Sequence, residues 1–159
     1  MKLAELKGFL EDRRKNRVLQ KYRAAILRRH YTELCTIIDF DRFGGYFNAN
    51  HFAELIHCTD KLRIIVIAHK KTWSPEIEEL KTKGNLEIRF LPHTDQDFGT
   101  EWLVGDNVAF ISDGEIHSII ECPDFAADLR KVFDWMWPSA EEATTGFTFA
   151  NPDQSLNGQ

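Results

Sequence analysis

Residues 100–117, TEWLVGDNVAFISDGEIH, are the stretch that decides the fold. Apolar residues at 102–104 and 108–111 predict two short strands, and Gly105-Asp106-Asn107 between them is typical of a tight turn. The chain before this stretch alternates strand and helix patterns, and the chain after it ends in an amphipathic helix. We therefore interpret residues 100–117 as a hairpin added to a βαβ scaffold.

Strand and helix patterns surround the hairpin in a regular order. Predicted strands are residues 34–40, 62–68, 86–91 and 116–121, and predicted helices are residues 50–57, 74–83 and 125–137. The near-continuous apolarity of residues 62–68 favours a central parallel strand that is buried on both faces. The order predicts an α/β fold with a mixed, mostly parallel sheet flanked by helices. In the last helix the predicted core face is Phe125, Leu129, Val132, Phe133 and Met136.

The N-terminal residues 1–33 predict a helical extension, because strong helix formers dominate and proline is absent. A polar segment near residue 12 leaves two alternatives open, one long helix or two helices. The apolar residues that favour self-association at its start are Leu3, Leu6, Phe9 and Leu10. We therefore divide the chain into a basic helical arm at 1–33, an α/β domain at 34–138 and a flexible tail at 139–159.

The net charge of −5 hides a strong asymmetry along the chain. Residues 1–34 contain ten Lys and Arg against four Asp and Glu, which gives +6 and leaves −11 for the remainder. A basic arm on an acidic body predicts contact with nucleic acid or with a protein partner. The alternative is that the arm folds back on its own body or is a solvated helix face. The candidate binding residues are Arg13, Arg14, Lys15, Arg17, Lys21, Arg23, Arg28 and Arg29.

Several classes of protein are disfavoured by the sequence. No apolar run approaches the roughly 20 residues that a membrane-spanning helix needs, and no signal-peptide pattern opens the chain. Cys35, Cys58 and Cys122 are odd in number and widely spaced, so they predict neither a zinc site nor a disulfide framework. We expect a cytoplasmic protein without a cofactor and without membrane contact.

Asp39-Phe40-Asp41, at the end of the first predicted strand, is the main candidate for catalysis. Two carboxylates two residues apart point to the same side and can hold a divalent metal. The alternative function is therefore a metal-dependent phosphodiesterase or nuclease. His69 and His93 follow neighbouring strands and could meet at one edge of the sheet, where α/β domains usually bind ligands.

The pieces LCTIIDF, LRIIVIAHK, SPEIEELKTKG, LEIRFLP and TEWLVGDNVAFISDG, followed by FAADLRKVFDWMWPSAE, resemble a phospholipase D-like domain. The resemblance covers about two thirds of the chain and looks closest to small bacterial domains of unassigned function. Active members carry His-x-Lys on the hairpin, where His attacks phosphorus and Lys binds phosphate oxygens. With Asp106 set on the family's aspartate, Gly99 and Glu101 stand at those two positions, and Asp113-Gly114 replaces Gly-Ser.

This resemblance implies a degenerate active site. Glu101, Asp106 and Asp113 are expected to lie close together with Glu115, so that the phosphate cradle becomes acidic. We therefore predict a non-catalytic phospholipase D-like module that binds or regulates. It would contact a protein or nucleic acid through its basic arm. Active relatives pair two such domains, so a homodimer through the sheet edge is also predicted.

Overall fold

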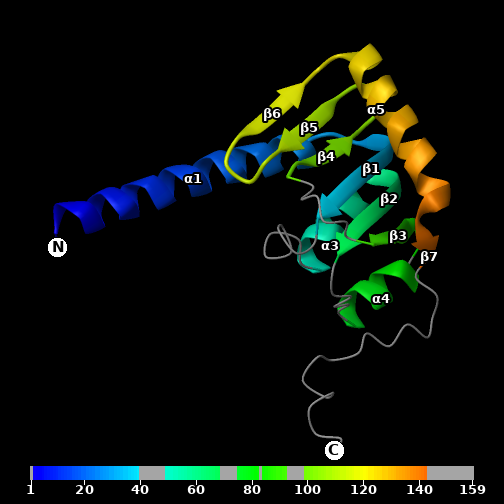
Figure 1. Ribbon diagram of the computed structural model, residues 1–159, viewed down its shortest axis with the longest axis horizontal. Helices are drawn as coiled ribbons and strands as arrows, with labels where there is room; N and C mark the ends of the chain where they lie inside the picture. Colours follow the sequence, from blue (N-terminus) through cyan, green and yellow to red (C-terminus); the bar gives the residue numbers. More distant parts are fainter. Residues whose placement is uncertain (1, 40–48, 69–74, 83, 93–98, 143–159) are drawn as a thin grey trace, which may run out of the picture.

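The computed structural model describes residues 2–39, 49–68, 75–82, 84–92 and 99–142, which build a seven-stranded sheet with helices on both faces (Figure 1). The strands lie in the order β6-β5-β4-β1-β2-β3-β7. Their bounds are β1 (Tyr31–Asp39), β2 (Thr59–Ala68), β3 (Leu86–Pro92), β4 (Glu101–Val104), β5 (Ala109–Ser112), β6 (His117–Ile120) and β7 (Glu141–Glu142). The predicted α/β class and mixed sheet are confirmed.

The central strands are parallel and the flanking strands are antiparallel. β1 pairs parallel with β2, and β2 pairs parallel with β3. The ladders β1–β4, β4–β5, β5–β6 and β3–β7 are all antiparallel. The prediction of a mostly parallel sheet is therefore wrong for the described strands. β4, β5 and β6 follow one another through short turns, and a short connection permits antiparallel pairing alone.

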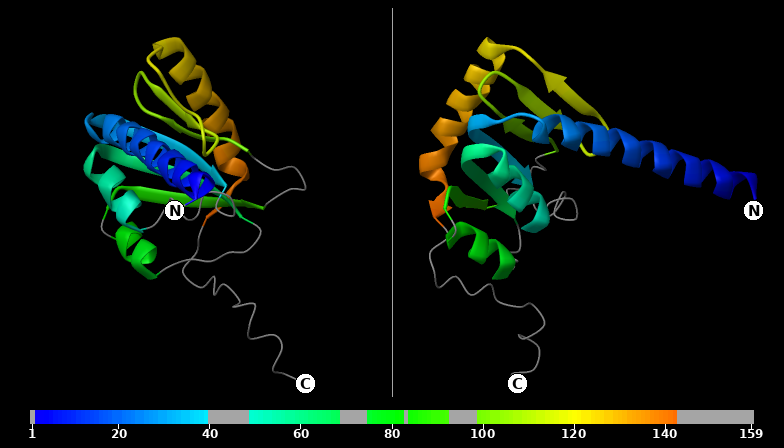
Figure 2. Two further views of the ribbon diagram at one scale, coloured as in Figure 1. Left: turned by 90° about the vertical axis from the view of Figure 1, so that its left-hand side faces the viewer. Right: turned by 180° about the vertical axis from the view of Figure 1, so that it is seen from behind.

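One face of the sheet is covered by three helices. α1 (Leu3–Leu27) is one continuous helix, which decides between the two alternatives left by the sequence. Its last turns bury Tyr22 and Ile26 on the sheet, while its first turns project from the body as an arm (Figures 1 and 2). α3 (Ala49–His57) buries Phe52 and Leu55 in the same core, and α4 (Pro75–Thr82) packs beside it.

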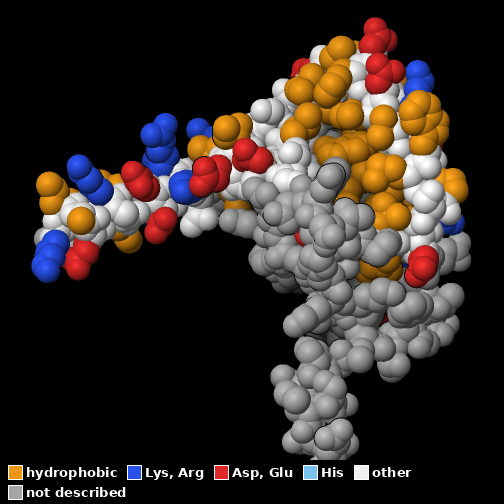
Figure 3. All heavy atoms as spheres, in the orientation of Figure 1, with side chains coloured by type: hydrophobic (Ala, Val, Ile, Leu, Met, Phe, Trp, Pro, Cys, Tyr) orange, Lys and Arg blue, Asp and Glu red, His pale blue; other side chains and the backbone are white. Residues whose placement is uncertain are grey.

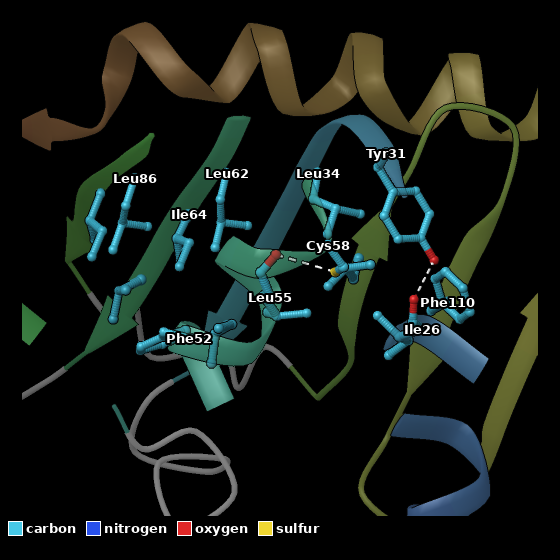
Figure 4. Close-up of a cluster of buried hydrophobic side chains, with 14 of the residues drawn as sticks. Ile26, Tyr31, Leu34, Phe52, Leu55, Cys58, Leu62, Ile64, Leu86 and Phe110 are labelled. Carbon is cyan, nitrogen blue, oxygen red and sulfur yellow. Dashed lines mark hydrogen bonds between the residues drawn. The ribbon is translucent and has the colours of Figure 1, made fainter. Parts of the chain in front are cut away.

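A cluster of buried hydrophobic side chains fills the core under these helices (Figure 4). Leu34, Leu55, Leu62 and Ile64 are fully buried there. The Tyr31 hydroxyl donates to the Ile26 carbonyl oxygen at 2.9 Å, which ties the end of α1 to the start of β1. This contact places the arm relative to the sheet.

The opposite face of the sheet is covered by α5 (Pro123–Met136), which continues into the short 3-10 helix η1 (Trp137–Ser139). Ala126 and Phe133 bury against Cys35, Ile37 and Ile65.

Two residues of α5 differ from the sequence prediction. Phe125 and Val132 are 36% and 39% exposed, so their assignment to the core face is wrong. The sheet receives the side of the helix that carries Ala126, Phe133 and the following Trp137, which turns Phe125 and Val132 toward the rim.

The boundaries of the α/β domain extend beyond those predicted from sequence. β1 begins at Tyr31 rather than at residue 34. The polar residues Thr32 and Glu33 interrupt the run of apolar residues, so the sequence pattern did not reveal the start of the strand. Residues 139–142 complete η1 and form β7 against β3, so these residues of the predicted tail belong to the domain. Within the described part of the chain, no helix combines the length and apolarity needed to cross a bilayer.

Candidate nucleic-acid interface

The arm formed by α1 is a 25-residue helix, about 37 Å long at 1.5 Å per residue. At its start, the Lys2 backbone N–H donates to the Glu5 carboxylate at 2.9 Å, which satisfies one of the free donors of the helix terminus. At its end, the Tyr22 ring lies edge-on to Phe110 and 4.8 Å from the ring centroid of His117. The sheet therefore anchors the C-terminal turns and leaves the N-terminal turns in solvent.

Three of the eight predicted binding residues hold the helix to the acidic body. Lys15 lies 3.6 Å from the Glu115 carboxylate, and Arg23 lies 3.5 Å from Glu54. Arg29 pairs with Glu121. Exposed pairs of this kind contribute about 0–1 kcal/mol each, so they orient the arm more than they stabilise it.

The remaining basic residues form an outer stripe along the arm, defined as Arg14, Arg17, Lys21 and Arg28. At 100° per residue these four positions fall within a sector of about 60° on the side away from Tyr22 and Ile26. All four side chains are exposed. Arg14, Arg17 and Lys21 form no ion pair with any residue in the described ranges. Figure 3 shows Lys and Arg side chains, interspersed with Asp and Glu, on the surface of the arm.

Arg13 lies beside the outer stripe and has a different environment. Its guanidinium carbon sits 5.4 Å from the centroid of the Phe9 ring, a cation–π contact within one helix. Phe9 belongs to the apolar tip of the arm, together with Leu3, Leu6 and Leu10, which are 40–71% exposed as a group. The tip is therefore an uncovered apolar surface next to a basic one.

The hairpin carboxylates do not form a single cradle. Glu101 pairs with Ser112 in the β4–β5 ladder, whereas Asp106 lies in the turn at the opposite end of both strands. Asp106 accepts the backbone N–H groups of Thr32 and Glu33 at 3.0 and 3.3 Å. The expectation that Glu101, Asp106 and Asp113 lie close together is wrong, because the length of the hairpin separates Asp106 from the other two.

Asp113 and Gly105 specify the turns of the hairpin region. The Asp113 carboxylate accepts the backbone N–H groups of Glu115 and Ile116 at 2.9 and 2.7 Å. A Cβ atom at Gly105 would lie 2.4 Å from Cδ1 of the buried Tyr31 ring, so the turn needs glycine there for space. Both residues therefore have structural roles in this part of the chain.

A row of buried polar side chains crosses the sheet beneath the root of α1. It comprises Glu101, Ser112 and the half-buried His117, which lie opposite one another on β4, β5 and β6, and Ser112 Oγ lies 2.8 Å from His117 Nδ1. Thr36 is buried on β1, opposite Leu103. Burial raises the pKa of Glu101 to about 8, so this carboxyl is mainly protonated at neutral pH. Burial, opposed by Asp113, lowers the pKa of His117.

Tyr22, on α1, packs over this row and contacts the ring of His117. Among the described atoms, its hydroxyl and that of Thr36 find no hydrogen-bond partner. Burial, followed by the nearby Glu101 carboxyl, raises the pKa of Tyr22. The row was not predicted from the sequence, although strand alternation places Glu101 on the same face as the core residue Leu103 and could have identified it.

The predicted metal and histidine sites fall largely outside the described residues. Asp39 ends β1 and is buried, whereas Asp41, His69 and His93 lie in ranges that the structure does not describe. The described residues contain no group of three or more His, Cys, Asp or Glu side chains placed to hold a metal ion. The Asp39–Asp41 pair stays a prediction.

Comparison with known proteins gives a likeness of fold. No protein-family model matches the chain, and no curated protein matches it. Its structure is similar to that of TrmBL2, an archaeal chromatin protein whose structure is described as showing a novel mode of DNA binding. The TM-score is 0.58 at 20% sequence identity, over 80% of this chain and 51% of the TrmBL2 chain. The present chain thus spans about half of the chain it matches.

Proposed function

We propose that the protein is a non-catalytic, phospholipase D-like module that binds nucleic acid, DNA in particular, through the outer stripe of α1. The observation that carries this proposal is the set of exposed, outward-facing cations at Arg14, Arg17, Lys21 and Arg28. Phosphate groups are the natural partners of such a row, since each neutralised phosphate releases condensed counterions. Contacts of this kind position a protein on the backbone without reading its sequence.

The distribution of charge determines which side of the molecule approaches DNA. Residues 35–159 carry −11, so the body repels a polyanion while the arm attracts it. An α-helix also has the width that the major groove admits. The N-terminal turns of the arm, which carry Arg14 and Arg17, project away from the sheet (Figure 2).

Two resemblances support this reading. TrmBL2, with which the chain shares a fold, is a chromatin protein described with a novel mode of DNA binding. The resemblance in sequence to phospholipase D-like domains supports a fold of the same general order, with Gly99 and Glu101 at the positions of the family's histidine and lysine. A protonated, buried Glu101 cannot supply the cation that phosphate chemistry requires, which favours binding over hydrolysis.

The proposal is tested with fluorescence anisotropy on a labelled DNA duplex at low salt. The full chain carrying Arg14→Gln, Arg17→Gln and Lys21→Gln should bind at least about tenfold more weakly, since three phosphate contacts are lost. The matched control is Lys15→Gln, Lys61→Gln and Lys81→Gln, which removes the same charge from side chains that face body carboxylates. Equal weakening in both variants would show that net charge, not the outer stripe, governs binding.

A protein partner is the alternative use of the arm, favoured by the exposed apolar tip. Leu3, Leu6, Phe9 and Leu10 would bind a partner's apolar groove or another arm. Duplex binding that survives loss of the outer stripe, together with loss of partner capture on Leu6→Gln and Leu10→Gln, would favour this alternative. The predicted homodimer through the arm or the sheet edge stays a prediction.

A further inference from the structure

The outer stripe of α1 continues toward the N-terminus as a row of leucines. This leucine row is defined as Leu3, Leu6 and Leu10, whose side chains are 71%, 40% and 55% exposed. At 100° per residue, the leucine row and the outer stripe together fall within a sector of about 80° around the helix axis. One side of the arm is therefore apolar over its first turns and basic over the turns that follow.

The carboxylates of α1 lie away from this side of the helix. They belong to Glu5, Glu11 and Asp12, and all three positions fall at least about 60° outside the shared sector. A surface with cations and without carboxylates favours a polyanion as its occupant. A bilayer surface fits less well, because cations and leucines on one side would have to enter the apolar region together.

A second copy of the chain is also disfavoured on this side of the arm. Pairing two helices along the whole length of the shared sector would bring Arg14 and Arg17 of both copies together, and like charges repel at that distance. The occupant that satisfies the cations is therefore the phosphate backbone already proposed for the outer stripe. Any such backbone would extend along the helix toward the leucine row.

The dimensions of the free part of the arm match those of the major groove. Lys15 is the first residue of α1 with an ion pair to the body in the described ranges, and residues 3–14 precede it over about 18 Å. The leucine row spans about 10.5 Å, and the major groove is about 12 Å wide. Arg14 follows Leu10 after about 6 Å. A helix that crosses the groove can therefore place its leucines over the base edges and Arg14 on the adjoining phosphates.

The base edges in the major groove offer one apolar group. Among the four standard bases, thymine alone presents a methyl group there, and the other exposed groups are hydrogen-bond donors and acceptors. Leucine over those polar groups would displace water without replacing its hydrogen bonds. We propose that the leucine row packs on thymine C5-methyl groups in the major groove and gives the arm a preference for thymine-rich duplexes. This inference rests on the proposed DNA binding and adds the class of sequence that is preferred.

Deoxyuridine tests the inference, because it pairs as thymidine does and lacks the C5-methyl group. Fluorescence anisotropy at low salt compares the full chain on a thymine-rich duplex with the same duplex carrying deoxyuridine at every thymidine. Wild type should bind the deoxyuridine duplex roughly tenfold more weakly, since each fully buried methyl group contributes about fourfold. Equal affinity for both duplexes would overturn this inference, leave DNA binding intact and assign the leucines to a protein partner. Failure to bind either duplex would overturn the proposed DNA binding as well.

The variant Leu6→Ala with Leu10→Ala tests which side chains recognise the methyl groups. Alanine is the strongest helix former, so the variant should keep its circular dichroism spectrum. It should bind both duplexes about as weakly as wild type binds the deoxyuridine duplex. Val18→Ala is the matched control, because Val18 is 42% exposed and lies outside the shared sector, and it should discriminate as wild type does. Undiminished discrimination by the leucine variant, or equal loss in Val18→Ala, would overturn the assignment to the leucine row.

Discussion

At the scale of single residues, the role of a basic side chain depends on whether it forms an ion pair within the protein. The cluster of eight basic residues was visible in the sequence, because a count of charges needs no coordinates. It could not separate Lys15, Arg23 and Arg29, which hold the arm to body carboxylates, from the exposed cations of the outer stripe. That separation depends on the side of the helix that packs on the sheet, and hence on the burial of Tyr22 and Ile26.

Glu101 gives the sharpest prediction at this scale. Its folded-state pKa of about 8 lies above the ordinary value of 4.5, so its contribution to stability is fully present below pH 4.5 and is lost as the pH rises to 8. The loss amounts to about 1.4 kcal/mol for each pH unit within that window. Glu101→Gln, which cannot ionise, should therefore remove this fall.

The measurement is the free energy of unfolding in urea at pH 5.0 and pH 8.5. Wild type should lose several kcal/mol between the two values, and Glu101→Gln should lose much less. Glu11→Gln, on the exposed part of the arm, is the matched control and should behave as wild type. Parallel pH profiles for wild type and Glu101→Gln would contradict the raised pKa.

At the scale of elements, the strands and helices were predictable where one local rule dominates. β2 is an apolar run, α4 begins at Pro75, and the hairpin has Gly-Asp-Asn in its turn. Two predictions were wrong, namely that the sheet is mostly parallel and that Phe125 belongs to the core. Both depend on which neighbour an element meets, and that is set by packing between distant segments rather than by local pattern.

Gly105 and Gly8 form a matched pair for testing the elements. Gly105→Ala should destabilise the protein by about 1–3 kcal/mol, because its Cβ would collide with the fully packed Tyr31 ring that holds the end of α1. Gly8→Ala, in the open part of the arm with no atom within 4 Å, should stabilise α1 by up to about 1 kcal/mol. Urea unfolding of both variants provides the comparison, and equal effects would show that the turn has room to relax.

At the scale of the whole molecule, the basic arm leaves from one face of the sheet and α5 covers the other (Figure 2). The rest of the chain is acidic, since residues 35–159 carry −11. The field of the body therefore repels a polyanion while the arm attracts it, so DNA should approach the molecule from the side of the arm.

The central claim, that the outer stripe of α1 binds DNA, is tested most directly by the salt dependence of binding. The slope of the logarithm of the binding constant against the logarithm of salt concentration counts neutralised phosphates at about 0.9 each. For Arg14→Gln, Arg17→Gln and Lys21→Gln together, the account predicts a slope smaller than that of wild type by roughly 2.7, with the control triple at Lys15, Lys61 and Lys81 close to wild type. Identical slopes in wild type and the outer-stripe variant, or no binding by wild type at low salt, would contradict it.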